Sequence, residues 1–150
     1  MKWVSHEIVT GMAVYTWTGS LVSTACAMAG AVLPDWIEGK GGGVRLPWRG
    51  LLAHRGWSHW PLLYVLGLLA LEAAEETHGE SAAGFILAGR FVLVGALFHI
   101  AEDALCGKVP LFHPAKKVGV RLFRVGSFAE YVFAIVVVIV CYVVGRLFLW

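Results

Sequence analysis

His99 and Asp103 have the types and the spacing of side chains that bind one metal ion from a single helix. They are four positions apart, so both side chains lie on one helical face, about one turn apart. Such a pair can supply one nitrogen and one oxygen to a metal ion. Ionisable side chains within an apolar helix are costly, so the pair indicates function; a hydrogen-bonded His–Asp pair between helices is the structural alternative.

Three more candidate ligands flank the apolar stretches of the chain. Asp35 ends the first stretch, and His54 and His59 enclose the segment HRGWSH just before the second. Taken one by one, they also fit a carboxylate that ends a helix and a polar loop at a membrane interface. Together with His99 and Asp103 they form a mixed nitrogen and oxygen set that suits one or two zinc ions, with manganese as the alternative. The lack of cysteine ligands argues against a purely structural zinc.

This set of residues predicts hydrolysis of a phosphoester. A bound metal ion would lower the pKa of a water molecule to about 7 and polarise a phosphoryl oxygen. Asp35 or Glu130 is the expected proton acceptor. Arg55, helped by Arg45 and Arg49, is expected to attract an anionic substrate, such as a lipid head group or another phosphate near the membrane.

Three other polar residues need a separate interpretation. Glu102 neighbours the His99–Asp103 pair on a different helical face, so we do not expect it to be a ligand. His78 belongs to an acidic turn on the opposite face and is expected to be exposed. His113 is on the same face as the site, where it either joins the site or packs a loop.

The composition indicates a membrane protein with one domain over residues 1–150. Hydrophobic residues make up 59% of the chain, charged residues make up 15%, and the mean hydropathy is +0.74. A soluble domain of this length needs more polar surface, whereas long apolar helices explain the balance directly. Apolar regions run over about 8–33, 60–74, 82–105 and 128–150. We therefore expect an all-α membrane bundle in which the last three regions span the bilayer.

The first apolar region predicts a helical hairpin, because Gly19-Ser20 divides it into two halves. One continuous helix of ~26 residues would extend ~39 Å and leave His6 on the face opposite Asp35. Two halves of ~12 residues, each ~18 Å long, bring His6 back beside Asp35. Such a re-entrant hairpin needs protein around its turn, and we favour it over a spanning helix. His6 then joins the candidate metal ligands.

The charged residues are segregated along the chain, and this predicts the orientation of the bundle. Nine of the twelve Lys and Arg residues lie in 40–55 and 108–124, and four of the ten acids lie in 72–80. If the last three regions cross the bilayer, the basic stretches share one face, and the positive-inside rule puts that face and the site in the cytoplasm. The expected partners are membrane lipid and an anionic, phosphate-containing substrate. A nucleic-acid partner is not expected, because membrane orientation already explains the modest number of basic residues.

The order of these motifs resembles the YdjM-like family of bacterial inner-membrane proteins, described as LexA-regulated, membrane-bound, metal-dependent hydrolases. The pattern is also similar to zinc-dependent phospholipase C, in which an HxxxD pair on a helix binds zinc. The matching segments are His6, Pro34-Asp35, His54-Arg55-Gly56-x-Ser58-His59, His99-x-x-x-Asp103 and Pro110-Leu111-Phe112-x-Pro114. The resemblance implies a helical metallohydrolase of the inner membrane, with His6, Asp35, His54, His59, His99 and Asp103 as ligands or near-ligands. The chain departs from the family pattern at Trp36-Ile37-Glu38, where a second Asp and a His are usual, so the resemblance leaves one or two ions open.

Two other functions compete with hydrolysis. The first is a non-catalytic membrane protein whose metal site or polar network organises the helices, as a structural or interaction partner. The second is an ion transporter, which is disfavoured because the candidate ligands lie at one face, whereas transporter sites lie near the membrane midplane. Turnover of a substrate separates hydrolysis from the first alternative.

Overall fold

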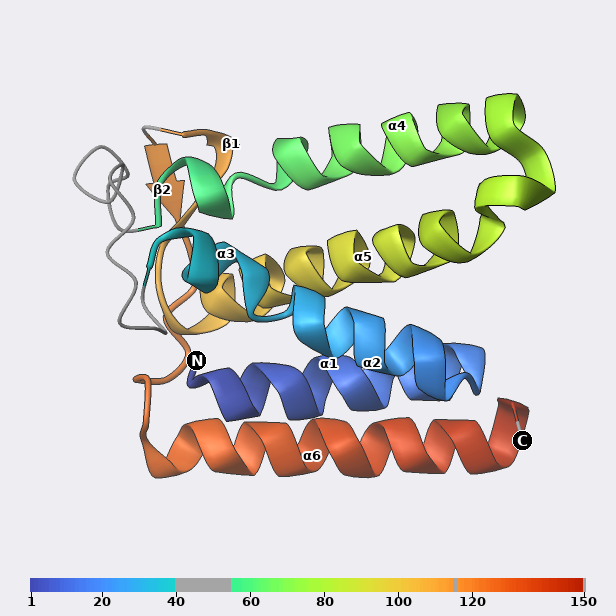
Figure 1. Ribbon diagram of the computed structural model, residues 1–150. Coiled ribbons are helices and arrows are strands. Elements are labelled where there is room, and N and C mark those ends of the chain that lie inside the picture. Colours follow the sequence, from blue (N-terminus) through green and yellow to red (C-terminus); the bar gives the residue numbers. More distant parts are fainter. Residues whose placement is uncertain (40–54, 115, 150) are drawn as a thin grey trace.

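The helices of the chain form one bundle, and a small β-hairpin lies at one end of it (Figure 1). The structure is a computed structural model that describes residues 1–39, 55–114 and 116–149. The long elements are α1 (Trp3–Thr18), α2 (Leu21–Gly30), α4 (Pro61–His78), α5 (Ala83–Cys106) and α6 (Phe128–Val144). The short ones are α3 (Leu33–Ile37), the 3-10 turns η1 (Trp57–His59) and η2 (Gly79–Ala82), and the π turn η3 (Gly145–Leu149). The expected helical bundle is confirmed.

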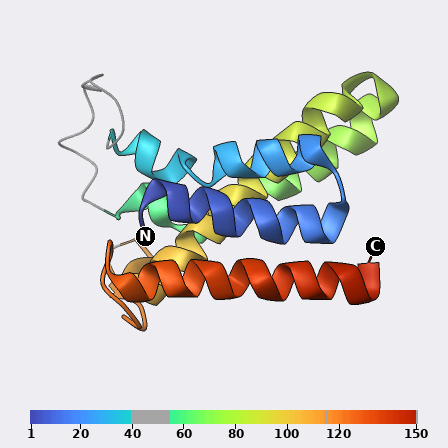
Figure 2. The same ribbon diagram turned by 90° about the horizontal axis from the view of Figure 1, so that it is seen from below.

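The N-terminal helices form the predicted hairpin. Gly19 ends α1 in the left-handed conformation (φ 63°), which a glycine adopts without a steric cost, and its N–H donates to the carbonyl of Tyr15 (2.8 Å). Ser20 then caps α2, since its side chain accepts a hydrogen bond from the N–H of Ser23 (3.2 Å). The chain therefore returns through α2 and α3 to the end at which α1 begins, with α1 between α2 and α6 (Figure 2).

Two helical stretches are long and apolar enough to cross a membrane. They are Pro61–Cys106 and Phe128–Phe148. The first turns back at η2, so it comprises the antiparallel pair α4 and α5 (Figure 1). Large apolar side chains along α6 are exposed on the molecule, Ile135 and Ile139 among them, which is the surface that a bilayer would cover.

Glycines set the distance between α2 and α5. A Cβ atom on Gly30 would lie 1.9 Å from the carbonyl oxygen of Val92, and one on Gly95 would lie 1.9 Å from that of Ala27. No side chain fits at either position, so the two backbones approach as closely as small residues allow. This contact fixes α2, and α3 after it, against the half of α5 that carries His99.

The structure differs from the sequence-based boundaries in three places. The helix α4 continues to His78, beyond the expected end near residue 74, through Glu75 and Glu76, which are good helix formers. The helix α6 gives way to a π turn at Gly145, before the expected end at residue 150. The strands β1 (Val109–His113) and β2 (Lys116–Val118) pair antiparallel with Val109 opposite Val118, in a stretch where no strand was expected.

Candidate metal centre

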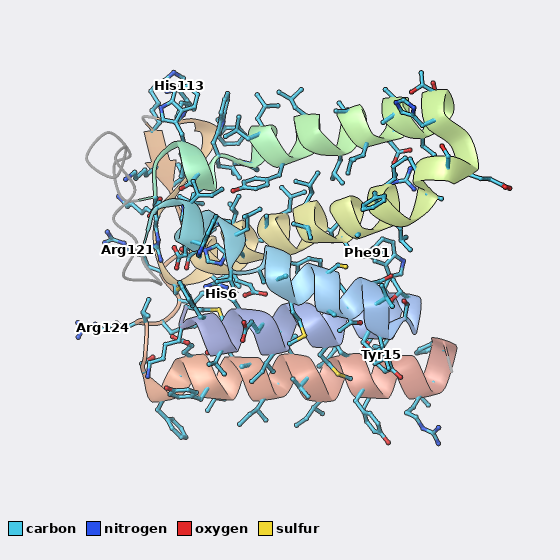
Figure 3. All side chains as sticks on the ribbon, viewed as in Figure 1. His6, Tyr15, Phe91, His113, Arg121 and Arg124 are labelled. Atoms are coloured by element: carbon cyan, nitrogen blue, oxygen red, sulfur yellow. The ribbon has the colours of Figure 1, made fainter. Side chains whose placement is uncertain are left out.

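Polar side chains gather where α1 begins, where α3 and η1 lie, and where α5 ends (Figure 3). The cluster contains His6 from α1, Asp35 from α3, His59 from η1, and His99 and Asp103 from α5. All five are buried, and the three histidines have no exposed surface. The structure thus brings together five of the six candidate ligands, while His54 lies outside the described residues. Their role as ligands stays a prediction.

The distances between the potential ligand atoms match those around a single ion. His59 Nε2 lies 3.3 Å from His99 Nε2, 3.4 Å from Asp35 Oδ1 and 3.5 Å from Asp103 Oδ2. His99 Nε2 lies 3.8 Å from the same two carboxylate atoms. Neighbouring ligands of a tetrahedral zinc, with Zn–N of 2.0–2.1 Å, are about 3.3 Å apart. Asp35, His59 and His99 therefore form one group able to hold an ion.

Each histidine already uses its other ring nitrogen, Nδ1, for a second contact. The partners are Glu102 Oε2 for His6 (2.5 Å), Glu38 Oε1 for His59 (3.0 Å) and the carbonyl of Ala31 for His99 (2.6 Å). In metal sites a ligating histidine almost always donates its second N–H to a carboxylate or a carbonyl, which fixes the ring and its tautomer. This pattern leaves the Nε2 lone pair of each ring for an ion.

His6 completes a second group with His99 and Asp103. Its ring stacks on that of His99, with centroids 4.0 Å apart. His6 Nε2 is buried and forms no hydrogen bond with a described residue, although Asp103 Oδ1 lies 3.5 Å away. A buried nitrogen without a partner costs about 1–3 kcal/mol, and a metal ion would remove that cost. The two groups share His99, and Asp103 turns one oxygen toward each of them.

Arg55 lies against Asp103, and its expected role in attracting an anionic substrate stays a prediction. Its Nε is 2.8 Å from Asp103 Oδ2, and its guanidinium packs so closely on Gly107 that a Cβ there would be 1.8 Å from Nη1. The N-terminal amine of Met1 lies 2.7 Å from the other oxygen of Asp103. Both cations contact Asp103, and the ionised carboxylate is the form that binds a metal ion.

The charge of His59 depends on three carboxylates around it. Burial alone would lower the pKa of His59, but hydrogen bonds with Asp103, Asp35 and Glu38 outweigh burial and raise that pKa to about 9. His59 is therefore protonated at neutral pH while no ion is bound. A metal ion has to displace this proton, because only the deprotonated nitrogen is a ligand.

Two residues that contact the cluster were missed from the sequence. Glu102 was expected on another face, yet it is buried and bonded to His6 and to the hydroxyl of Thr10 (3.1 Å). Glu38, which was given no role, accepts a hydrogen bond from Ser58 (2.6 Å) beside His59. A signal did exist, because Glu102 follows His99 by three positions and Glu38 follows Asp35 by three, a spacing that keeps helical residues on one face.

Glu130 belongs to neither of the two groups, and its expected role as a base stays a prediction. Its Oε1 accepts hydrogen bonds from the N–H of Lys2 (2.9 Å) and the hydroxyl of Ser5 (2.6 Å), and its Oε2 accepts from the N–H of Gly126 (2.7 Å). The side chain thus ties the start of α1 to the loop before α6. His78 is exposed at the far end of α4, as expected, and His113 is exposed on β1.

The fold and the cluster define a helical membrane protein with a buried His/carboxylate site able to hold a metal ion. The chain belongs to the YdjM inner membrane protein family, whose family model matches residues 1–150. No curated protein and no solved structure matches the chain. The predicted family is therefore confirmed over the whole sequence, and with it a protein of the inner membrane.

Proposed function

We propose that the chain is a membrane-bound metal-dependent hydrolase that cleaves a phosphoester of a lipid or of another substrate near the membrane surface. The observation that carries the proposal is the convergence of three histidine Nε2 atoms and two carboxylates, with every Nδ1 already held. Zinc is the best fit to this donor set, with manganese as the alternative. Bound there, zinc would lower the pKa of a water molecule to about 7 and polarise a phosphoryl oxygen.

The residues of the cluster would have different roles around the ion. Asp35, His59 and His99 would hold the ion, and three protein ligands are the usual number at catalytic zinc sites, which keep one position open. Asp103 lies beside this group, where it would serve as a further ligand or accept a proton. His6 and Asp103 would support a second ion; His99 belongs to both groups, but its one free nitrogen, Nε2, binds a single ion at a time.

The bundle would cross the membrane several times, with the cluster at the cytoplasmic face. Lys108, Lys116 and Arg124 are exposed at the end that carries the cluster, whereas Glu76 and Glu80 are exposed at the opposite end. Short loops rich in Lys and Arg tend to stay cytoplasmic. A substrate phosphate in the inner leaflet would then lie on the same side as the candidate metal centre.

A non-catalytic role is the second candidate, and the burial of the cluster favours it. The three histidines have no exposed surface, and Asp103 is only 2% exposed. A closed site of this kind can tie α1, α3 and α5 together through a metal ion alone. In that case removal of the metal would lower the melting temperature, and no substrate would be turned over.

The decisive experiment measures zinc and manganese by elemental mass spectrometry in detergent-purified protein, followed by phosphate release from liposomes. We expect about one ion per chain in the wild type and loss of both metal and turnover in the His99→Ala/Asp103→Ala variant. His78→Ala is the matched control, because this histidine is exposed at the far end of α4. Turnover that survives the double substitution would refute a metal-dependent hydrolase.

A further inference from the structure

A cavity lies beside the cluster, between the end of α5 and the loop that leads into α6. It measures about 500 Å³ and is lined by Cys106, Arg121, Leu122, Phe123 and Arg124. The loop that forms its wall is fixed to α5 by two backbone hydrogen bonds, from Val120 to the carbonyl of Ala104 (2.9 Å) and from Leu122 to that of Leu105 (2.7 Å).

The cavity reaches the candidate metal centre through Cys106. This side chain lines the cavity, and its Sγ lies 3.7 Å from Asp103 Oδ1. None of the five described residues that line the cavity is acidic, and two of them are arginines. Within the described part of the chain, neither arginine forms an ion pair. No described acidic side chain therefore neutralises their positive charge.

The loop has the composition of a segment that lies among lipid head groups. Exposed cations alternate with exposed apolar side chains, since Val120 is 66% and Leu122 is 63% exposed beside Arg121 and Arg124. The apolar stretch Phe128–Phe148 follows directly and has 21 residues, or ~31 Å of helix, which matches the hydrocarbon core of a bilayer. The loop at its start therefore falls in the head-group layer.

We infer that this cavity binds the phosphate of an anionic phospholipid from the inner leaflet. Arg121 and Arg124 would donate hydrogen bonds to the phosphate oxygens, for which the guanidinium fork is well suited. Leu122 and its exposed apolar neighbours would contact the upper part of the acyl chains. Arg121 has φ 60°, a conformation that non-glycine residues rarely adopt.

Both arginines project from the end of the bundle at which His6 lies (Figure 3). A lipid phosphate bound there would sit at the edge of the candidate metal centre, one helical turn of α5 away from Asp103. The inference rests on the membrane placement in the proposed function and does not require turnover. It also differs from the sequence-based expectation, which assigned anion binding to Arg55.

Native mass spectrometry of metal-free, full-length protein in a mild detergent tests the inference, with phosphatidylglycerol and phosphatidylcholine titrated separately. We expect the first phosphatidylglycerol to bind at least about tenfold more tightly than phosphatidylcholine. The double variant Arg121→Gln/Arg124→Gln should lose about fivefold in phosphatidylglycerol affinity for each arginine and leave the phosphatidylcholine affinity unchanged. The control variant Lys108→Gln/Lys116→Gln removes the same charge from exposed positions outside the cavity, and should change either affinity by less than about twofold.

Equal weakening by the two double variants would overturn the inference, because diffuse charge would then explain the preference. The absence of a preference in the wild type would overturn it as well. Displacement of the lipid by an equal concentration of glycerol 3-phosphate would show a site for soluble phosphates and remove the lipid assignment. Because the protein is free of metal in every arm, these outcomes do not depend on whether it is a hydrolase.

Discussion

Replacing Glu38 by glutamine tests whether the cluster is a metal centre through a residue that need not touch the ion. Glu38 Oε1 lies 3.0 Å from His59 Nδ1 and accepts a hydrogen bond from Ser58 (2.6 Å). Glu38→Gln keeps the size of the side chain and removes its charge. The ring of His59 then loses the carboxylate that orients it and that makes its Nε2 a stronger ligand.

The size of the effect follows from this contact. Loss of a carboxylate partner of a ligating histidine typically lowers metal affinity about 10–100-fold, which is about 1.4–2.8 kcal/mol. We expect a decrease in this range for zinc in Glu38→Gln. Glu102→Gln acts on His6, which belongs to the other group, so it should weaken the first ion much less.

Competition with a chromophoric zinc chelator, in the same detergent for all variants, gives the affinities. Glu80→Gln is the control, because Glu80 is exposed in η2 at the far end of the bundle. An affinity of Glu38→Gln within about twofold of the wild type would refute the assignment of Glu38 as the partner of a ligating histidine. Equal losses in Glu38→Gln and Glu102→Gln would instead place both histidines on one ion, against two separate groups.

Three further predictions concern proton release, helix packing and the loop before α6. Zinc affinity should rise by about tenfold for each pH unit between pH 6 and 8, because the ion displaces a proton from His59, whose pKa is about 9. Titration calorimetry in buffers of different ionisation enthalpy measures the number of protons released. Gly95→Ala should lower the stability by about 1–3 kcal/mol or more, measured by thermal unfolding, because its Cβ would meet the carbonyl of Ala27 at 1.9 Å. Glu130→Ala should lower the melting temperature and leave the metal content unchanged, because its oxygens bond to α1 and to the loop and not to the cluster.

The sequence predicted the turn between α1 and α2, and the residues that share one helical face, better than the contacts between elements. Gly19 marks the hairpin because a left-handed helix end favours glycine, and the position of His6 beside Asp35 follows from helix length. The spacing of His99 and Asp103 likewise places both on one face. These inferences use geometry within one helix or one turn, which a sequence expresses directly.

The contacts that the sequence did not predict join different elements. Glu38 meets His59 only because α3 and η1 lie side by side, and nothing local to either segment requires it. Glu130 lies near the start of α6, which made it a candidate for the site, yet it accepts hydrogen bonds from Ser5 of α1 and from Lys2, just before α1. The short β-hairpin has few residues and exposed side chains, so it lacks the alternating pattern by which strands are recognised.

Helix packing and the chemistry of the cluster are linked through the end of α2. Gly30 and Gly95 allow α2 to lie directly on α5, and the residue after Gly30 is Ala31, whose carbonyl is left without a helical partner at the end of the helix. The Nδ1 atom of His99 forms a hydrogen bond with this carbonyl oxygen, at 2.6 Å. A larger residue at position 30 would push the carbonyl away and free the ring of His99 to turn. The small residues therefore do more than pack the bundle, because their close approach also fixes which nitrogen of His99 faces the candidate metal centre.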